Sequence, residues 1–197
     1  MSVSKTRQHL INVARELFAT RGLETTTMND IAVASQKGRR TLYTYFRSKE
    51  EVYAAVIASE LERLSENLDQ VAGSDLPPDE KIFSLIYTHL EQTKETVARN
   101  GSLKAEFFGN IADVERARRA FDMEEIFVLR RIISEGVQQG RFHVENVVLT
   151  ADIIHYAIKG IEVPYILDRM GEGVGEEEAK VAVRALLRRA LGVNNQP

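Results

Sequence analysis

The sequence contains no cysteine. This absence excludes a disulfide scaffold, zinc sites built from thiolates and catalysis by a thiol. It also removes any argument for an oxidising compartment. A cross-link is not needed for stability, because 197 residues, 44% of them hydrophobic, are enough to bury a core.

Long hydrophobic runs are missing as well. No uninterrupted apolar stretch approaches the roughly 18 residues that a membrane-spanning helix needs. The first residues, MSVSKTRQHL, lack the apolar segment of a signal peptide. We therefore expect a soluble, cytoplasmic protein with no membrane partner.

The net charge of −3 hides an uneven distribution of charge along the chain. Residues 1–50 carry nine basic and four acidic residues, whereas residues 51–197 carry 17 basic and 25 acidic ones. A basic N-terminal region (residues 1–50, the basic front) followed by an acidic remainder indicates that the N-terminal region binds a polyanion. The alternative is chance clustering of charge.

Strand patterns, internal repeats and low-complexity tracts are also absent, whereas apolar residues recur at helical spacing almost everywhere. Turn and capping residues divide this pattern, and a long helix follows Ser48 up to a break at 72–78. The other expected helices cover residues 5–21, 28–35, 39–45, 78–99, 113–139, 146–170 and 176–191. The fold class predicted is all-α.

Two short helices joined by a tight turn, after a longer helix, form a helix-turn-helix pattern. The second short helix must bury Leu42 and Phe46, which leaves its other positions free to face a DNA major groove. Arginine is well shaped for paired hydrogen bonds to guanine, and threonine can contact a thymine methyl group. The predicted base-reading residues are Arg39, Arg40, Thr41, Thr44 and Tyr45.

Two stretches of this region, TTMNDIA at residues 26–32 and TLYTYFRSKEE at residues 41–51, resemble the N-terminal signature of the TetR (tetracycline-repressor-like) family. The resemblance covers about a quarter of the chain. It implies a homodimeric transcription regulator, usually a repressor, that a small ligand releases from a palindromic operator in double-stranded DNA. It also implies a helix-turn-helix domain over residues 1–50 and a helical ligand-binding and dimerisation domain over 51–197.

The resemblance further implies that the cap of the first short helix, the tyrosine after Thr-Leu and the lysine of the next helix contact phosphates. With the neighbouring basic residues, the predicted phosphate contacts are Thr27, Lys37, Tyr43, Arg47 and Lys49. The turn departs from the family pattern, which usually has glycine followed by an apolar residue. Either Gln36 takes the left-handed conformation, or Gly38 takes it in a shifted turn.

Apolar residues spaced three and four apart near the C-terminus form seams on two expected helices. Two such helices provide half of a four-helix dimer interface, although packing within the chain is an equal alternative. The predicted interface residues are Val147, Ala151, Ile154, Ile158, Ala179, Val183, Leu186 and Ala190.

Aromatic residues and histidines between residues 78 and 170 are candidates for the wall of a ligand pocket, by analogy with the fold. They are Phe83, Tyr87, Phe107, Phe108, Phe121, Phe127, His155 and Tyr156, with His89 as a further polar point. Aromatic residues at helical spacing are also typical of a plain core.

Two other functions compete with a DNA-binding regulator. A helical metal enzyme would use Asp152 and His155 on one helical face, but the Glu-x-x-His motifs of di-iron proteins are absent. No nucleophile or phosphate-loop motif is present. A helical adaptor would bind a protein through the basic front. We expect no catalytic residue, metal or cofactor, and an unidentified small molecule as the effector.

Overall fold

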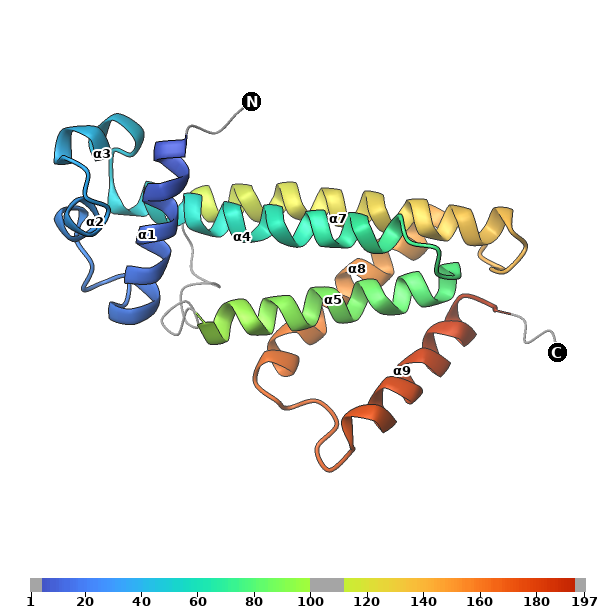
Figure 1. Cartoon of the computed structure of the whole chain (residues 1–197). Helices are drawn as coiled ribbons and strands as arrows, with labels where there is room; N and C mark the ends of the chain where they lie inside the picture. The colour runs from blue at the N-terminus through green and yellow to red at the C-terminus, as the bar shows by residue number, and fades with distance from the viewer. Residues whose placement is uncertain (1–4, 100–111, 194–197) are drawn as a thin grey trace. The chain divides into compact units, whose positions relative to one another are not determined.

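The computed structural model describes residues 5–99 and 112–193, and every regular element within them is an α-helix. This confirms the all-α prediction. The helices are α1 (Lys5–Arg21), α2 (Met28–Ala34), α3 (Arg39–Tyr45), α4 (Lys49–Ala72), α5 (Pro78–Arg99), α7 (Ala112–Gln138), α8 (Val147–Ile166) and α9 (Glu176–Ala190) (Figure 1). None of the helices in these ranges is long and apolar enough to cross a membrane.

The helix bounds follow local signals in the sequence. Thr27 and Asp30 form the expected capping box of α2, in which the Thr27 hydroxyl accepts from the Asp30 amide at 3.2 Å. The largest departure is the end of α8, expected at residue 170 but found at Ile166. The helix continues through Pro164, and just after its end Asp168 takes a left-handed φ of 52°, which does not fit a continuing helix.

The chain divides into two compact units. The first consists of residues 1–63 and 95–120, and the second consists of residues 64–94 and 121–197. The predicted boundary at residue 50 lies within the first unit, because α4 continues unbroken from Lys49 to Ala72. A division of functions at residue 50 stays a prediction.

The first unit packs α1, α2 and α3 around a shared apolar core. Phe18, Ile31 and Leu42, one from each helix, are at most 1% exposed. The Phe18 ring meets the ring of Tyr53 edge-on at 5.8 Å, which joins α1 to α4. This core fixes the rotation of each short helix, and with it the side chains that reach solvent.

The turn between α2 and α3 settles the alternative left open by the sequence. Gln36 takes the left-handed conformation with φ of 54°, whereas Gly38 has φ of −64° and caps α3. The Lys37 amide donates to the Ala32 carbonyl at 3.1 Å, and this bond closes the turn. A non-glycine residue therefore carries the strained position, at a cost of about 1–2 kcal/mol.

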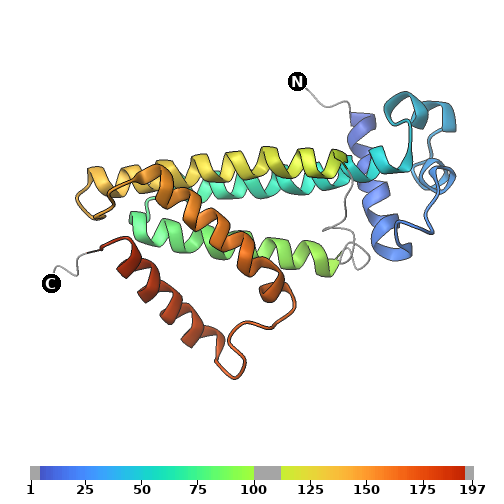
Figure 2. The ribbon, with the colours of Figure 1, turned by 180° about the vertical axis from the view of Figure 1, so that it is seen from behind.

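In the second unit, α8 lies against both α5 and α7 (Figure 2). Leu85, Leu129 and Ile158, from these three helices, are at most 1% exposed. Helix α9 has no buried residue, and ion pairs connect it to the start of α5. The Arg184 Nε atom lies 3.0 Å from Glu80 Oε1, and Arg188 Nη1 lies 3.6 Å from Asp79 Oδ2.

Candidate functional site

Helix α3 turns its polar residues to solvent because its large apolar neighbours are held in the core. Leu42 is fully buried, and Phe46, which follows the helix, is 2% exposed. Arg39, Arg40 and Thr44 are exposed, whereas Thr41 and Tyr45 are partly exposed. A recognition helix requires this division between a buried and an outward face.

Four basic side chains around α3 are not neutralised by any carboxylate of the described residues. They are exposed, and no carboxylate of the described residues forms an ion pair with Lys37, Arg39, Arg40 or Arg47. Unpaired basic charge at one face attracts a polyanion and makes binding dependent on salt.

The hydroxyl of Thr44 is already engaged with the backbone of its own helix. Its Oγ1 donates to the Arg40 carbonyl at 2.9 Å. The exposed side chain therefore offers its methyl group rather than a free donor. An apolar contact with a thymine methyl group is the interaction that this arrangement favours.

Two of the predicted phosphate contacts have partners inside the chain. The Thr27 hydroxyl donates to Asp30 Oδ2 at 2.6 Å within the capping box. The Lys49 ammonium donates to the Leu23 carbonyl at 2.7 Å and to that of Glu24 at 3.3 Å. Lys37, Tyr43 and Arg47 are exposed, and their side chains form no hydrogen bond with the described residues. All five assignments to DNA stay predictions.

Arg7 on α1 is a residue that the sequence analysis missed. Its guanidinium carbon lies 5.2 Å from the centre of the Phe46 ring, a distance typical of a cation–π contact. This contact adds a basic group beside α3. No local pattern marks it, because the two residues are 39 positions apart.

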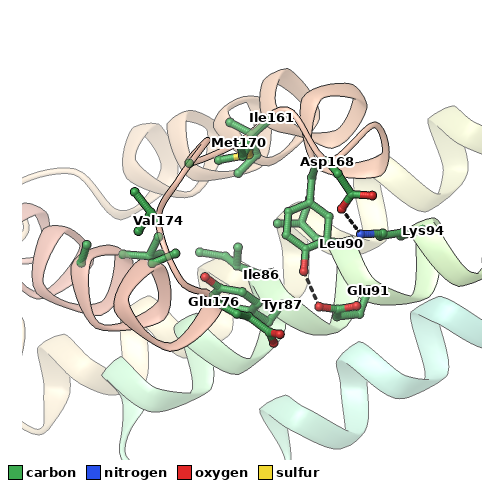
Figure 3. Close-up of a pocket in the computed structure, with 15 residues that line it drawn as sticks. Ile86, Tyr87, Leu90, Glu91, Lys94, Ile161, Asp168, Met170, Val174 and Glu176 are labelled. Atoms are coloured by element: carbon green, nitrogen blue, oxygen red, sulfur yellow. Dashed lines mark hydrogen bonds and ion pairs between the residues drawn. The ribbon is translucent and has the colours of Figure 1, made fainter.

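The second unit contains a cavity of about 620 Å³ between α5, the C-terminal part of α8, the loop that follows α8, and α9 (Figure 3). Its wall is largely apolar, with Ile86 and Leu90 from α5, Ile161 from α8 and Val183 from α9. A volume of this size, with few polar groups, is typical of a site for a small molecule.

The polar groups of the cavity join α5 to the end of α8. The Tyr165 hydroxyl donates to Glu91, and the Lys94 ammonium is paired with Asp168 (Figure 3). Burial, together with the bond to Glu91, raises the pKa of Tyr165, so its hydroxyl keeps its proton. The Tyr87 and Tyr165 rings meet edge-on at 6.5 Å.

Among the predicted pocket residues that the structure describes, only Tyr87 lines this cavity. Phe127 and Tyr156 are 65% and 68% exposed, so they point to solvent. Phe83 is buried beneath the Arg184 guanidinium, 3.9 Å from its ring centre, and Phe121 is buried beside His89. Phe107 and Phe108 lie outside the described residues.

His155 and His89 belong instead to a buried charged network. Glu125 is 1% exposed and accepts from His89 Nδ1 at 2.5 Å and from His155 Nδ1 at 2.6 Å. Burial lowers the pKa of His89, but hydrogen bonds with Glu125 and Glu162 outweigh burial and raise it to about 9. Burial raises the pKa of Glu125, but both histidines outweigh burial and lower it to about 2. This network ties α5, α7 and α8 together.

The pair proposed for a metal enzyme is divided between different partners. Arg130 Nη2 donates to Asp152 at 3.0 Å, whereas His155 is bound to Glu125. No group of three or more histidine, aspartate or glutamate side chains in the described part of the chain could hold a metal ion.

The predicted dimer-interface residues lie in several different environments, and their role in a dimer stays a prediction. Ala151 and Ile158 are at most 1% exposed, because they pack against the core of their own unit and are closed to a partner. Ala179 and Val183 line the cavity. Val147 and Ile154 are partly exposed, and Leu186 and Ala190 are exposed.

A different face of α8 carries the exposed apolar side chains. Leu149, Ile153 and Tyr156, spaced four and three residues apart, are 56%, 59% and 68% exposed. Met123 and Phe127 on α7 are exposed as well. The sequence missed this face because α8 is apolar on more than one side.

Comparison with known proteins gives a family match at the N-terminus. The model described as "Bacterial regulatory proteins, tetR family" matches residues 10–56, from within α1 to the start of α4. The HTH-type transcriptional regulator AcrR of Shigella flexneri is 30% identical over 131 residues. That match covers 61% of this chain and 59% of AcrR, less than two thirds of its length.

Two further proteins are similar over more of their length. The HTH-type transcriptional repressor KstR2 of Mycolicibacterium smegmatis is 27% identical over 164 residues, which cover 78% of this chain and 74% of KstR2. The structure of FadR from Bacillus subtilis in complex with stearoyl-CoA has a TM-score of 0.66 and 18% identity. It covers 96% of this chain and 99% of FadR, and it shows a shared fold.

Proposed function

We propose that this chain, which belongs to the TetR family of helix-turn-helix transcriptional regulators, is a homodimeric repressor that a small molecule releases from a palindromic operator. The observation that carries the proposal is the orientation of α3. Leu42 and Phe46 are buried, while Arg39 and Arg40 of the same helix face solvent. Action on an operator would place the protein in the cytoplasm.

Within this proposal, α3 enters the major groove and its residues divide into two roles. Arg39 and Arg40 read base edges, with Thr41, Thr44 and Tyr45 beside them, because they lie on the outward side of the helix. Lys37, Tyr43 and Arg47 hold phosphates, since they are exposed at the ends and flank of α3. Thr27 and Lys49 can contact phosphates only if they give up their hydrogen bonds to Asp30 and to the Leu23 carbonyl.

A homodimer explains how one short helix can specify an operator. Two copies related by a two-fold axis read two half-sites, about one helical turn of DNA apart or a multiple of it. The exposed apolar residues of α8, Leu149, Ile153 and Tyr156, together with Leu186 of α9, support an interface with a second copy.

The cavity of the second unit supports a small-molecule effector. FadR of Bacillus subtilis holds stearoyl-CoA, which shows that this fold accommodates a ligand of that kind in another protein. The Glu91–Tyr165 and Lys94–Asp168 contacts close the polar end of the cavity here, so a bound molecule would rearrange them.

Selection of bound duplexes from a random double-stranded DNA pool tests the proposal with the full chain. We expect enrichment of an inverted repeat, with binding that weakens steeply as salt rises. Enrichment of a single half-site would contradict the dimer. Absent or salt-independent binding would contradict DNA recognition and favour an adaptor that binds protein.

A further inference from the structure

We propose that the cavity between α5, α8 and α9 takes an amphipathic organic cation, a molecule with an apolar body and one ammonium-type group. The inference rests on the proposed function, because it names the chemical class of the effector. It is carried by three features of the second unit: the apolar wall, the surroundings of two tyrosine rings, and the balance of charge.

The apolar wall sets the body of the ligand. Ile86, Leu90, Ile161 and Val183 contribute side chains from three helices, and they give the ligand no hydrogen-bond partner. A cavity of about 620 Å³ lies within the range that small organic ligands occupy. A purely polar ligand would lose its hydration here without replacement.

The tyrosine rings of the cavity already carry ammonium groups of the chain itself. Lys94 Nζ lies 5.4 Å from the centre of the Tyr165 ring, and Lys180 Nζ lies 5.8 Å from that of Tyr87. Both distances fall within the reach of a cation–π interaction. The surroundings of these rings therefore attract positive charge, which Lys94 and Lys180 supply.

The charge of the wall points the same way. Three carboxylates line the cavity, those of Glu91, Asp168 and Glu176, against one basic residue, Lys94. Lys94 is paired with Asp168, and Lys180 is bound to Glu176 at 2.6 Å. Glu91 accepts the Tyr165 hydroxyl, but no basic residue of the described chain forms an ion pair with it. Glu91 is thus the carboxylate of the wall whose charge no basic residue of the described chain balances.

An anionic effector would meet the opposite conditions. A carboxylate or phosphate beside Glu91 would face a like charge in a partly buried site, where such repulsion is poorly screened. The similarity to FadR shows the fold alone, so its stearoyl-CoA does not decide the class of ligand here. Because the charged residues of the cavity wall are mostly acidic, an experiment can distinguish a cationic ligand from an anionic one.

Isothermal titration of the full chain with two probes of equal tail length, decyltrimethylammonium and undecanoate, tests the inference. Both are used below the concentrations at which they form micelles. We expect the cation to bind at least about tenfold more tightly than the anion. Glu91→Gln keeps a hydrogen-bond acceptor for Tyr165 but removes the negative charge. The substitution should therefore weaken the binding of the cation roughly tenfold. The matched control, Glu145→Gln at an exposed site outside the cavity, should leave its binding unchanged.

A second variant keeps the test decisive if Glu91→Gln fails to fold. Tyr165→Phe retains the ring and frees Glu91, so the cation should bind as well as before or more tightly. Equal or tighter binding of undecanoate would overturn the inference. So would the absence of binding by both probes, as expected if a second copy of the chain fills the cavity. An unchanged affinity of Glu91→Gln would overturn it as well.

The titration contains no DNA, so it is independent of operator selection. Operator enrichment without cation binding would overturn this inference and leave the repressor proposal intact. Cation binding without operator enrichment would overturn the repressor proposal and leave this inference about the cavity intact.

Discussion

In the first unit, Lys37, Arg39, Arg40 and Arg47 are exposed and form no ion pair with a described carboxylate, whereas the second unit holds a carboxylate between two histidines in its core. Exposed charge contributes little to folding but remains available for a partner. Buried charge contributes to folding only while every partner is present. Substitutions of the exposed basic residues in the first unit should therefore alter binding, and those in the network of the second unit should alter stability.

The largest effect is expected from Glu125→Ala. It leaves His89 and His155 buried without their shared acceptor, so the free energy of unfolding should fall by roughly 3–5 kcal/mol in urea denaturation. The control is Glu66→Ala, at an exposed position of α4 in the same unit, with an expected change of less than about 0.5 kcal/mol. Equal effects of the two substitutions would refute the stabilising role of the network.

The same network predicts how stability depends on pH. The pKa of His89 is raised to about 9, so its contribution is complete below about pH 6.5 and is lost as pH rises through 9. The lowered pKa of Glu125 gives a contribution that is present above about pH 4.5 and is lost as pH falls towards 2.

Urea unfolding at several pH values between 6 and 9.5 should show an alkaline loss of up to about 3 kcal/mol. Glu125 on α7 and Glu162 on α8 face His89, and both favour its charged form. In His89→Gln this alkaline slope should be much smaller. A slope of the same size in the variant would assign the pH dependence to other groups.

In the first unit, Arg39→Ala should leave stability unchanged and weaken binding to the selected operator by about 1–3 kcal/mol. The loss should be concentrated at one base pair per half-site, as measured by gel-shift titration with single-base variants. Lys37→Ala should weaken binding to all DNA sequences alike and should reduce the dependence of binding on salt concentration. If the two variants behave identically, the division into base and phosphate contacts is wrong.

The smallest effect is expected at the turn of the first unit. Gln36→Gly should raise the free energy of unfolding by about 1 kcal/mol, because glycine adopts the left-handed conformation without steric cost. Gly38→Ala is the matched comparison, since Gly38 has an ordinary φ and open space around its Cα. It should change the free energy of unfolding by less than about 0.5 kcal/mol. The reverse ranking in thermal unfolding would contradict the observed turn.

The sequence predicts the first unit better than the second because the determinants of α1 to α3 are local. The capping box of Thr27 and Asp30 and the spacing of Leu42 and Phe46 lie within a few residues of each other. One local feature of this unit is not predicted by the sequence. Either Gln36 or Gly38 could take the left-handed position in a turn of this length, and the structure places Gln36 there.

The second unit depends on contacts between distant residues, and there the sequence predicts less. Helix α8 is apolar on two sides, so spacing alone cannot tell the buried Ala151 and Ile158 from the exposed Leu149 and Ile153. His89 and His155 are noticeable as polar points, but Glu125, 36 and 30 residues away from them, is not. The cavity wall likewise depends on where the loop after α8 and helix α9 come to lie.

The attachment of α9 by ion pairs has a consequence for the cavity that it covers. Arg184 and Arg188 hold this helix to Glu80 and Asp79, and no residue of α9 is buried deeply enough to replace them. Dissolved salt weakens such partly exposed pairs but leaves the apolar packing of α5, α7 and α8 intact. The outer wall of the cavity therefore loosens before the rest of its unit as ionic strength rises, so entry of a small molecule should respond to the salt content of its surroundings.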